Sequence, residues 1–134
     1  MDEHQRIAIA EFVSDRTPRR LSGALLSFDL PNEVALLHDE PNWHLQGHNA
    51  RTLIKHDDFR LVLISLRAGK QVHESGLDEP IAVQPLHGRL RVEVPSQVVD
   101  LGPQQLLSIG KGERYAFEAI EDCAFLLWIG WSKG

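Results

Sequence analysis

A chain of 134 residues with 43% hydrophobic residues falls in the usual size range of one domain and can bury about two-thirds of its unfolded surface. A formal net charge of −5 excludes a general nucleic-acid binder, because such proteins need clustered lysine and arginine. No apolar run reaches the roughly 18 residues of a membrane span, and residues 1–20 are too charged for a signal peptide. Cys123 stands alone, so no internal disulfide can form. We therefore expect one soluble, cytoplasmic domain that binds neither nucleic acid nor membrane.

The N-terminal segment predicts one short helix. Residues 7–13, IAIAEFV, fit both the helical and the strand period, and the choice stays open. Asp29 stands where an N-cap would, two residues before Pro31, and Pro41 prevents a longer helix. Apolar residues recur on one helical face at Leu30, Val34 and Leu37. A helix of two to three turns is predicted from Leu30 to near His38.

The next segment, WHLQGH at residues 43–48, places His44 and His48 four residues apart. On a helix the two imidazoles would share a face. Pro41 and Asn42 before this segment and Gly47 within it favour a loop instead. A metal site at this pair is therefore not expected.

From residue 51 onward the chain changes to short β-type runs at spacings of about eight to twelve residues, separated by turn residues. The runs are RTLIK (51–55), FRLVLISL (59–66), IAVQPL (81–86), RLRVEV (89–94), QVVDL (97–101), QLLSI (105–109), RYAFEA (114–119) and CAFLLWIGW (123–131). This pattern predicts an antiparallel sandwich or barrel.

These runs show two different hydrophobic patterns. RLRVEV alternates, with Leu90, Val92 and Val94 predicted to face inward. Residues 59–66 and 124–131 are nearly continuous apolar runs, which is typical of strands covered on both faces. We expect the N-terminal segment or a partner subunit to cover one sheet.

Three stretches resemble the cupin superfamily, most closely its small stand-alone members. They are AG at 68–69, PIAVQPLHGRLRVEV at 80–94 and QQLLSIGKGERYAFEAIEDCAFLL at 104–127, and the resemblance covers about residues 43–131. It implies an all-β jelly-roll barrel, or double-stranded β-helix, over residues 51–134. Residues 1–50 would form an arm and short helix that pack on the barrel or on a partner subunit.

The resemblance also implies a metal pattern, from which this sequence departs. Cupins of known activity commonly bind one divalent metal through two or three histidines and a glutamate. Counted from Gly69, Gly88 and Gly112, the four ligand positions are occupied by Ser75, Leu77, Ile81 and Tyr115. Because leucine and isoleucine carry no donor atom, we expect no metal cofactor at these positions.

Other side chains offer an alternative. His73, Glu79 and His87 lie near the substituted positions and, together with Tyr115, could rebuild a site for one divalent transition metal. Such a protein would be a metal-dependent enzyme of the oxygenase or isomerase kind. Whether the chain is an enzyme stays open, and the substitutions favour a non-catalytic protein.

Our main hypothesis is a metal-free module that binds a small, weakly polar organic molecule. The predicted lining consists of Ser75, Leu77, Ile81, Val83 and Tyr115, mostly apolar with two hydroxyl groups. A core filled by these same side chains is the alternative.

A homodimer is also expected. Open jelly rolls expose strand edges that favour association, and related barrels are often dimers. Trp128 and Trp131 on the last strand are candidate anchors for that interface.

Overall fold

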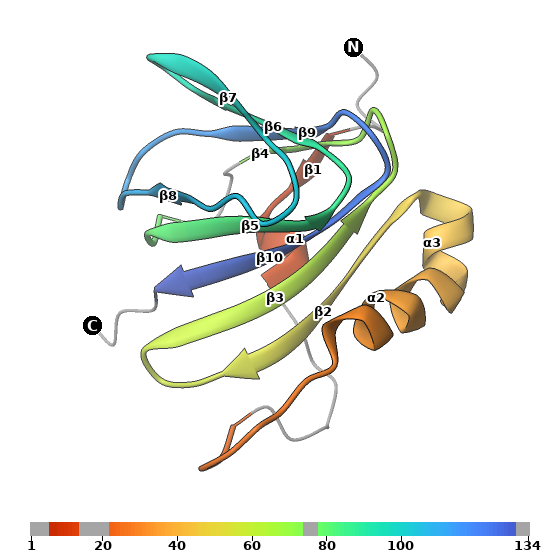
Figure 1. Cartoon of the computed structure of the whole chain (residues 1–134). Helices are drawn as coiled ribbons and strands as arrows, with labels where there is room; N and C mark the ends of the chain where they lie inside the picture. Colours follow the sequence, from red (N-terminus) through yellow and green to blue (C-terminus); the bar gives the residue numbers. More distant parts are fainter. Residues whose placement is uncertain (1–5, 14–21, 74–77, 131–134) are drawn as a thin grey trace.

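A computed structural model describes residues 6–13, 22–73 and 78–130, and it contains two five-stranded sheets packed face to face (Figure 1). The predicted all-β jelly roll is confirmed. Ser75, Leu77 and Trp131 lie outside the described residues. Within the described ranges, no helix is long and apolar enough to cross a membrane.

The chain passes repeatedly from one sheet to the other. The first sheet contains, in spatial order, β1 (Arg6–Ala8), β4 (Gln71–His73), β9 (Ala116–Ala119), β6 (Leu90–Val94) and β7 (Gln97–Leu101). The second contains β2 (His48–Lys55), β3 (Phe59–Leu66), β10 (Cys123–Gly130), β5 (Ile81–His87) and β8 (Leu107–Ile109). All pairs are antiparallel except β1 with β4. The described part of the chain also contains three helices, α1 (Ala10–Val13), α2 (Leu30–Asp39) and α3 (Pro41–Gln46).

All eight predicted strand runs form strands, with β2 beginning three residues earlier than expected, at His48. Two strands were missed. β4 has only three residues, too few for a visible alternation, and β1 belongs to the segment whose period was ambiguous. That segment contains both structures, because β1 ends at Ala8 and α1 begins at Ala10.

The main core lies between the sheets. On β6, Leu90 and Val92 are fully buried while Glu93 is exposed, as the alternation predicted. Phe117 of β9 meets Phe125 of β10 across the sandwich in a T-shaped contact, with ring centroids 5.9 Å apart. Each sheet therefore contributes alternate residues to one hydrocarbon interior.

A second core covers the outer face of the second sheet. Leu61 and Leu63 of β3 point away from the main core and pack against Val34 and Leu37 of α2. The continuous apolar run of β3 is thus explained by burial on both faces, and within the chain it is α2 that covers it. The predicted helix is confirmed, with the Asp29 side chain accepting the N–H of Asn32 as N-cap.

The loop predicted around His44 is wrong, because residues 41–46 form α3. Pro41 occupies the first turn of this helix, where its missing N–H costs nothing. Gly47 is the C-cap, with a φ of 75° in the left-handed region. The proline and glycine that favoured a loop therefore mark the two ends of a short helix.

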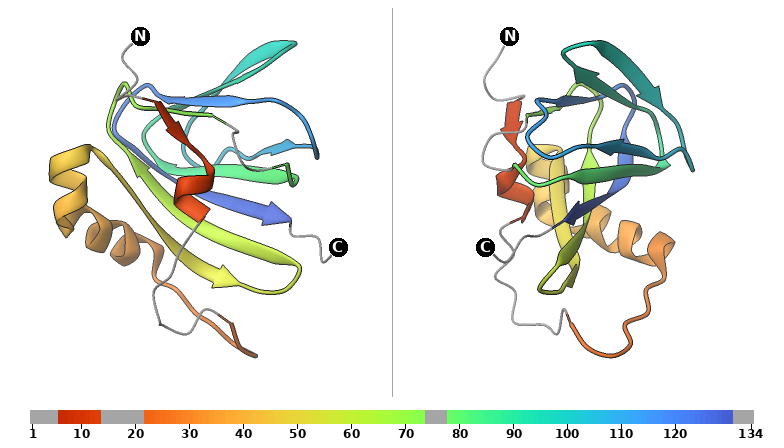
Figure 2. Two further views of the ribbon diagram at one scale, coloured as in Figure 1. Left: turned by 180° about the vertical axis from the view of Figure 1, so that it is seen from behind. Right: turned by 90° about the vertical axis from the view of Figure 1, so that its left-hand side faces the viewer.

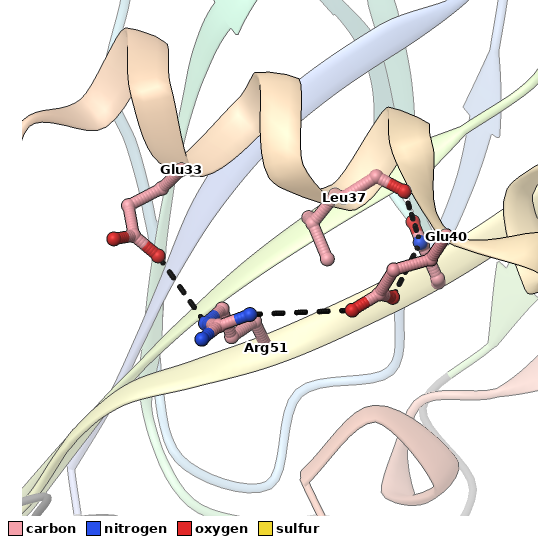
Figure 3. Close-up of polar contacts among 5 residues, drawn as sticks. Glu33, Leu37, Glu40 and Arg51 are labelled. Carbon is pink, nitrogen blue, oxygen red and sulfur yellow. Dashed lines mark hydrogen bonds and ion pairs between the residues drawn. The ribbon is translucent and has the colours of Figure 1, made fainter.

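A polar clamp holds α2 on β2 (Figure 3). The Arg51 side chain lies 3.2 Å from the Glu33 carboxylate and 4.0 Å from that of Glu40. Asn49 Nδ2 donates to the Leu37 carbonyl, at 2.7 Å, and to Glu40 Oε1, at 3.0 Å. Because these residues come from both ends of α2 and from one strand, the clamp fixes the direction of the helix across the sheet.

His38 makes a second contact between α2 and the sheet. Its Nε2 lies 2.8 Å from Ser65 Oγ, and its ring stacks on Trp43 with centroids 4.3 Å apart. Burial lowers the pKa of His38 below its ordinary 6.5, and His87 lowers it further, whereas Asp122 and Asp39 act in the opposite direction.

We predict that the folded protein loses stability as the pH falls below about 6.5. Since the folded-state pKa of His38 is lowered, the unfolded chain binds the proton first, and the free energy of unfolding is highest above that pH. Urea unfolding at pH 7.5 and at lower pH measures the loss. His38→Gln should reduce the pH dependence without abolishing it, because burial also lowers the pKa of His48.

Ser65→Ala is the matched control, since it removes the hydrogen bond but leaves the imidazole. It should cost about 1 kcal/mol at each pH and keep the wild-type pH dependence. An unchanged pH dependence in His38→Gln would contradict this assignment.

Gly88 allows a close approach between two chain segments. It follows β5 with a φ of 79°, and a Cβ added there would lie 2.7 Å from Cys123 Cα and closer still to the Asp122 carbonyl oxygen. Gly69 also has a positive φ, 91°, but nothing lies within 4 Å of its Cβ position. Alanine would therefore be strained in its backbone at either position, but only at Gly88 would its Cβ also clash with neighbouring backbone.

We predict that Gly88→Ala destabilises the protein by about 1–3 kcal/mol more than Gly69→Ala. The left-handed conformation should cost about 1 kcal/mol or slightly more in both variants, and only Gly88→Ala adds the backbone clash. Urea unfolding of both variants measures the difference, and equal losses would show that the chain at Gly88 moves aside without cost.

Candidate functional site

One side of the jelly roll is closed by the N-terminal residues. β1 pairs with β4 at the edge of the first sheet, and α1 packs against β2 and β3 of the second. Figure 2 shows β1 and α1 running from one sheet to the other. Phe12 and Val13 are buried there, and Phe12 meets His48 with ring centroids 6.0 Å apart. This side is therefore filled with apolar side chains.

The other side carries a cleft between the two remaining edge strands, β7 and β8. Figure 1 shows the β6–β7 hairpin leaning away from β8. The cleft has a volume of about 360 Å³. Four half-buried or buried aliphatic side chains that pack against the main core form its floor: Val94, Val99, Leu107 and Ile109. The remaining lining consists of Pro95, Ser96, Gln97, Ser108, Gly110 and Glu113.

Three of the five predicted lining residues lie beside this cleft rather than in it. Ile81 and Val83 are buried on the inner face of β5, and Tyr115 is buried against Phe117, with ring centroids 5.2 Å apart. On β8, Ile109 pairs with Ile81 and Leu107 pairs with Val83. Since directly opposed residues share a sheet face, the open space begins one strand farther out than expected.

The sequence did not identify the residues that line the cleft. The alternation of QLLSI could have assigned Leu107 and Ile109 to one face. That Leu107 and Ile109 face Val94 and Val99 across the cleft depends on which strands form the sheet edges. The edges in turn depend on strand pairing across the whole chain.

The displaced metal candidates do not gather at one point. His73 ends β4 in the first sheet, and Glu79 precedes β5 in the second. His87 ends β5, about 20 Å along the strand from Ile81, and its ring meets His38 on the outer side, with centroids 5.9 Å apart. Within residues 6–13, 22–73 and 78–130, no group of three or more His, Cys, Asp or Glu side chains could hold a metal ion.

The side chains at the positions where the cupin pattern has its ligands do not fit a divalent metal either. Ile81 offers hydrocarbon where the family pattern has a carboxylate, and Tyr115 is packed in the core where the pattern has an imidazole. The residues present therefore do not form the ligand set that the fold family implies.

Two nucleophilic groups are held where a substrate cannot reach them. Burial raises the pKa of the Cys123 thiol to about 12, so a reactive thiolate does not form near neutral pH. Ser65 is fully buried beneath α2, and its contact with His38 therefore positions the helix. Neither residue supports nucleophilic catalysis.

A second cleft, of about 410 Å³, lies near the end of β10. It is lined by Phe59, Pro80, Ile81, Ala82, Trp128, Ile129 and Gly130. Trp128 is 37% exposed and lies 6.5 Å from Phe59 between ring centroids. Apart from its indole, the described lining has no polar side chain to orient a ligand. The homodimer expected at Trp128 stays a prediction.

Comparisons with known proteins identify the fold. No protein-family model matches the sequence, and no curated protein matches it. Among solved structures, a cupin superfamily protein from Desulfitobacterium hafniense is similar with a TM-score of 0.67 and 19% identity, over 85% of this chain and 100% of that one. A conserved protein of unknown function from Streptococcus pyogenes gives 0.65 and 18%, over 86% and 95%.

A third similar structure is a cupin-2 domain containing protein from Shewanella frigidimarina, with a TM-score of 0.60 and 17% identity over 75% of this chain and 91% of that one. At such identities the likeness concerns the fold. The two sheets, their strand order and these neighbours together show that this chain has the cupin fold.

Proposed function

We propose that this protein is a non-catalytic, metal-free cupin module that binds a small organic molecule in the cleft between β7 and β8. The observation that carries the proposal is the cleft itself: about 360 Å³, with an aliphatic floor continuous with the core and a polar rim. Ligand sites in proteins have this volume and this division between apolar floor and few polar groups.

The donor set supports binding without a metal. Ile81 stands where the family pattern has a carboxylate, and His87 ends β5 whereas Glu79 lies before the start of that strand. A metal-dependent enzyme is the alternative, and metal analysis separates the two.

We predict that Leu107→Trp abolishes ligand binding in the cleft, because Leu107 lies in its floor and an indole would occupy the space. Leu106→Trp is the matched control: Leu106 is the preceding residue, is exposed and does not line the cleft. Binding of small-fragment mixtures is measured by backbone amide chemical-shift changes in residues 94–99 and 107–113.

Fragments that shift these amides in the wild type should lose at least about tenfold in affinity in Leu107→Trp and keep it in Leu106→Trp. Circular dichroism and thermal unfolding confirm that both variants fold. Unchanged binding in a folded Leu107→Trp protein would place the site elsewhere.

We also predict that protein purified without chelators contains manganese, iron, nickel, zinc and copper only far below one atom per chain. Elemental analysis of the wild type, His73→Ala and His87→Ala checks this. Stoichiometric metal that His73→Ala or His87→Ala removes would refute the metal-free proposal in favour of the metal-dependent enzyme.

A further inference from the structure

We propose that the ligand of the β7–β8 cleft is an organic cation, an ammonium group on a short hydrocarbon body, and that Glu113 is its anionic partner. This inference rests on the proposed function, since it assigns the chemical class of the molecule bound at the same site.

The described side chains that line the cleft carry negative charge and no positive charge. Among the described residues that line it, Glu113 is the only one with a charged side chain. Lys111 and Arg114 flank Glu113 in the sequence, but neither lines the cleft. A carboxylate ligand would meet a like charge with no cation in the lining to offset it, and this disfavours anions.

Backbone contacts place Glu113 at the end of β8. The Gly112 N–H donates to the Asp78 carbonyl at 2.9 Å, which ties the β8–β9 connection to the residues before β5. The Glu113 N–H donates to the Gly110 carbonyl at 3.3 Å, and Glu113 Cγ lies 4.0 Å from the position of a Cβ on Gly110. The first carbons of the Glu113 side chain therefore lie beside Gly110, which also lines the cleft.

The neutral polar groups complete an ammonium site. Ser96 and Gln97 each carry an oxygen that can accept a hydrogen bond, and both line the cleft. An ammonium group has three N–H donors and no acceptor, so one donor can meet Glu113 while the others meet these oxygens or water.

The floor determines the rest of the ligand. Val94, Val99, Leu107 and Ile109 present only aliphatic carbon. A volume of about 360 Å³ is at the small end of ligand sites. The hydrocarbon body is therefore short, such as a branched chain or one saturated ring.

Three probes of similar shape test whether the ligand is a cation, a neutral molecule or an anion: cyclohexylmethylamine, cyclohexylmethanol and cyclohexanecarboxylate. Titrations at low salt follow the backbone amides of residues 94–99 and 107–113. We expect the amine to bind about two- to fivefold more tightly than the alcohol, because an exposed charge pair contributes this much, and the carboxylate to bind most weakly. The preference for the amine should shrink at high salt.

Glu113→Gln removes the charge and keeps the shape, so amine and alcohol should then bind equally. Glu93→Gln is the matched control, because Glu93 is exposed on the outer face of β6 and does not line the cleft. It changes the net charge by the same amount and should leave the preference for the amine intact. If Glu93→Gln reduced the preference for the amine as much as Glu113→Gln does, overall charge and not Glu113 would attract the amine.

Failure of this inference is distinguishable from failure of the proposed function. Equal binding of amine and alcohol, or tighter binding of the carboxylate, with the same amides shifted, overturns the cationic ligand and leaves the cleft as a binding site. Amine binding that shifts amides elsewhere overturns the role of Glu113. Binding of fragments that Leu107→Trp does not affect overturns the proposed function itself.

Discussion

Burial of β3 and β10 on both faces is the constraint on which the rest of the structure depends. Their inward residues join the core between the sheets, and their outward residues, such as Leu63 and Leu126, join the second core under α2. Hydrocarbon on both faces requires two layers of cover, and one chain provides both: the first sheet on the inside and α2 on the outside. With the N-terminal residues committed to closing one side, the cleft is formed at the opposite edge, between β7 and β8.

Polar contacts in this protein position elements more than they stabilise them. Arg51 between Glu33 and Glu40 is half-buried, and such pairs contribute little net free energy because desolvation offsets attraction. Their value is directional, since they fix how α2 crosses β2. The contact between His38 and Ser65 acts in the same way at the end of the helix. Hydrophobic burial supplies the stability, and these groups select one arrangement of it.

Hydrocarbon packing also separates the cleft from the positions at which the cupin pattern has its metal ligands. Ile81 carries only hydrocarbon and is buried, and the surrounding side chains pack against it. Polar groups survive at the rim, where water satisfies them when no ligand is bound. Glu113 is such a group, since it lines the cleft and remains exposed.

The sequence by itself determined β2, β3 and the six strands from β5 to β10, the helix capped by Asp29 and the resemblance to cupins, because alternation, capping and turn residues are local signals. It also determined that Ile81 cannot hold a metal, since side-chain chemistry does not depend on the fold. Only the tertiary structure decided that residues 41–46 form α3 and that Leu107 and Ile109 face the open edge. A helix of six residues is stabilised by its packing and not by its own sequence; here its buried Trp43 stacks on His38 of α2. Likewise, the position of the cleft follows from which strands are left without a neighbour, and this is fixed only when distant parts of the chain have paired.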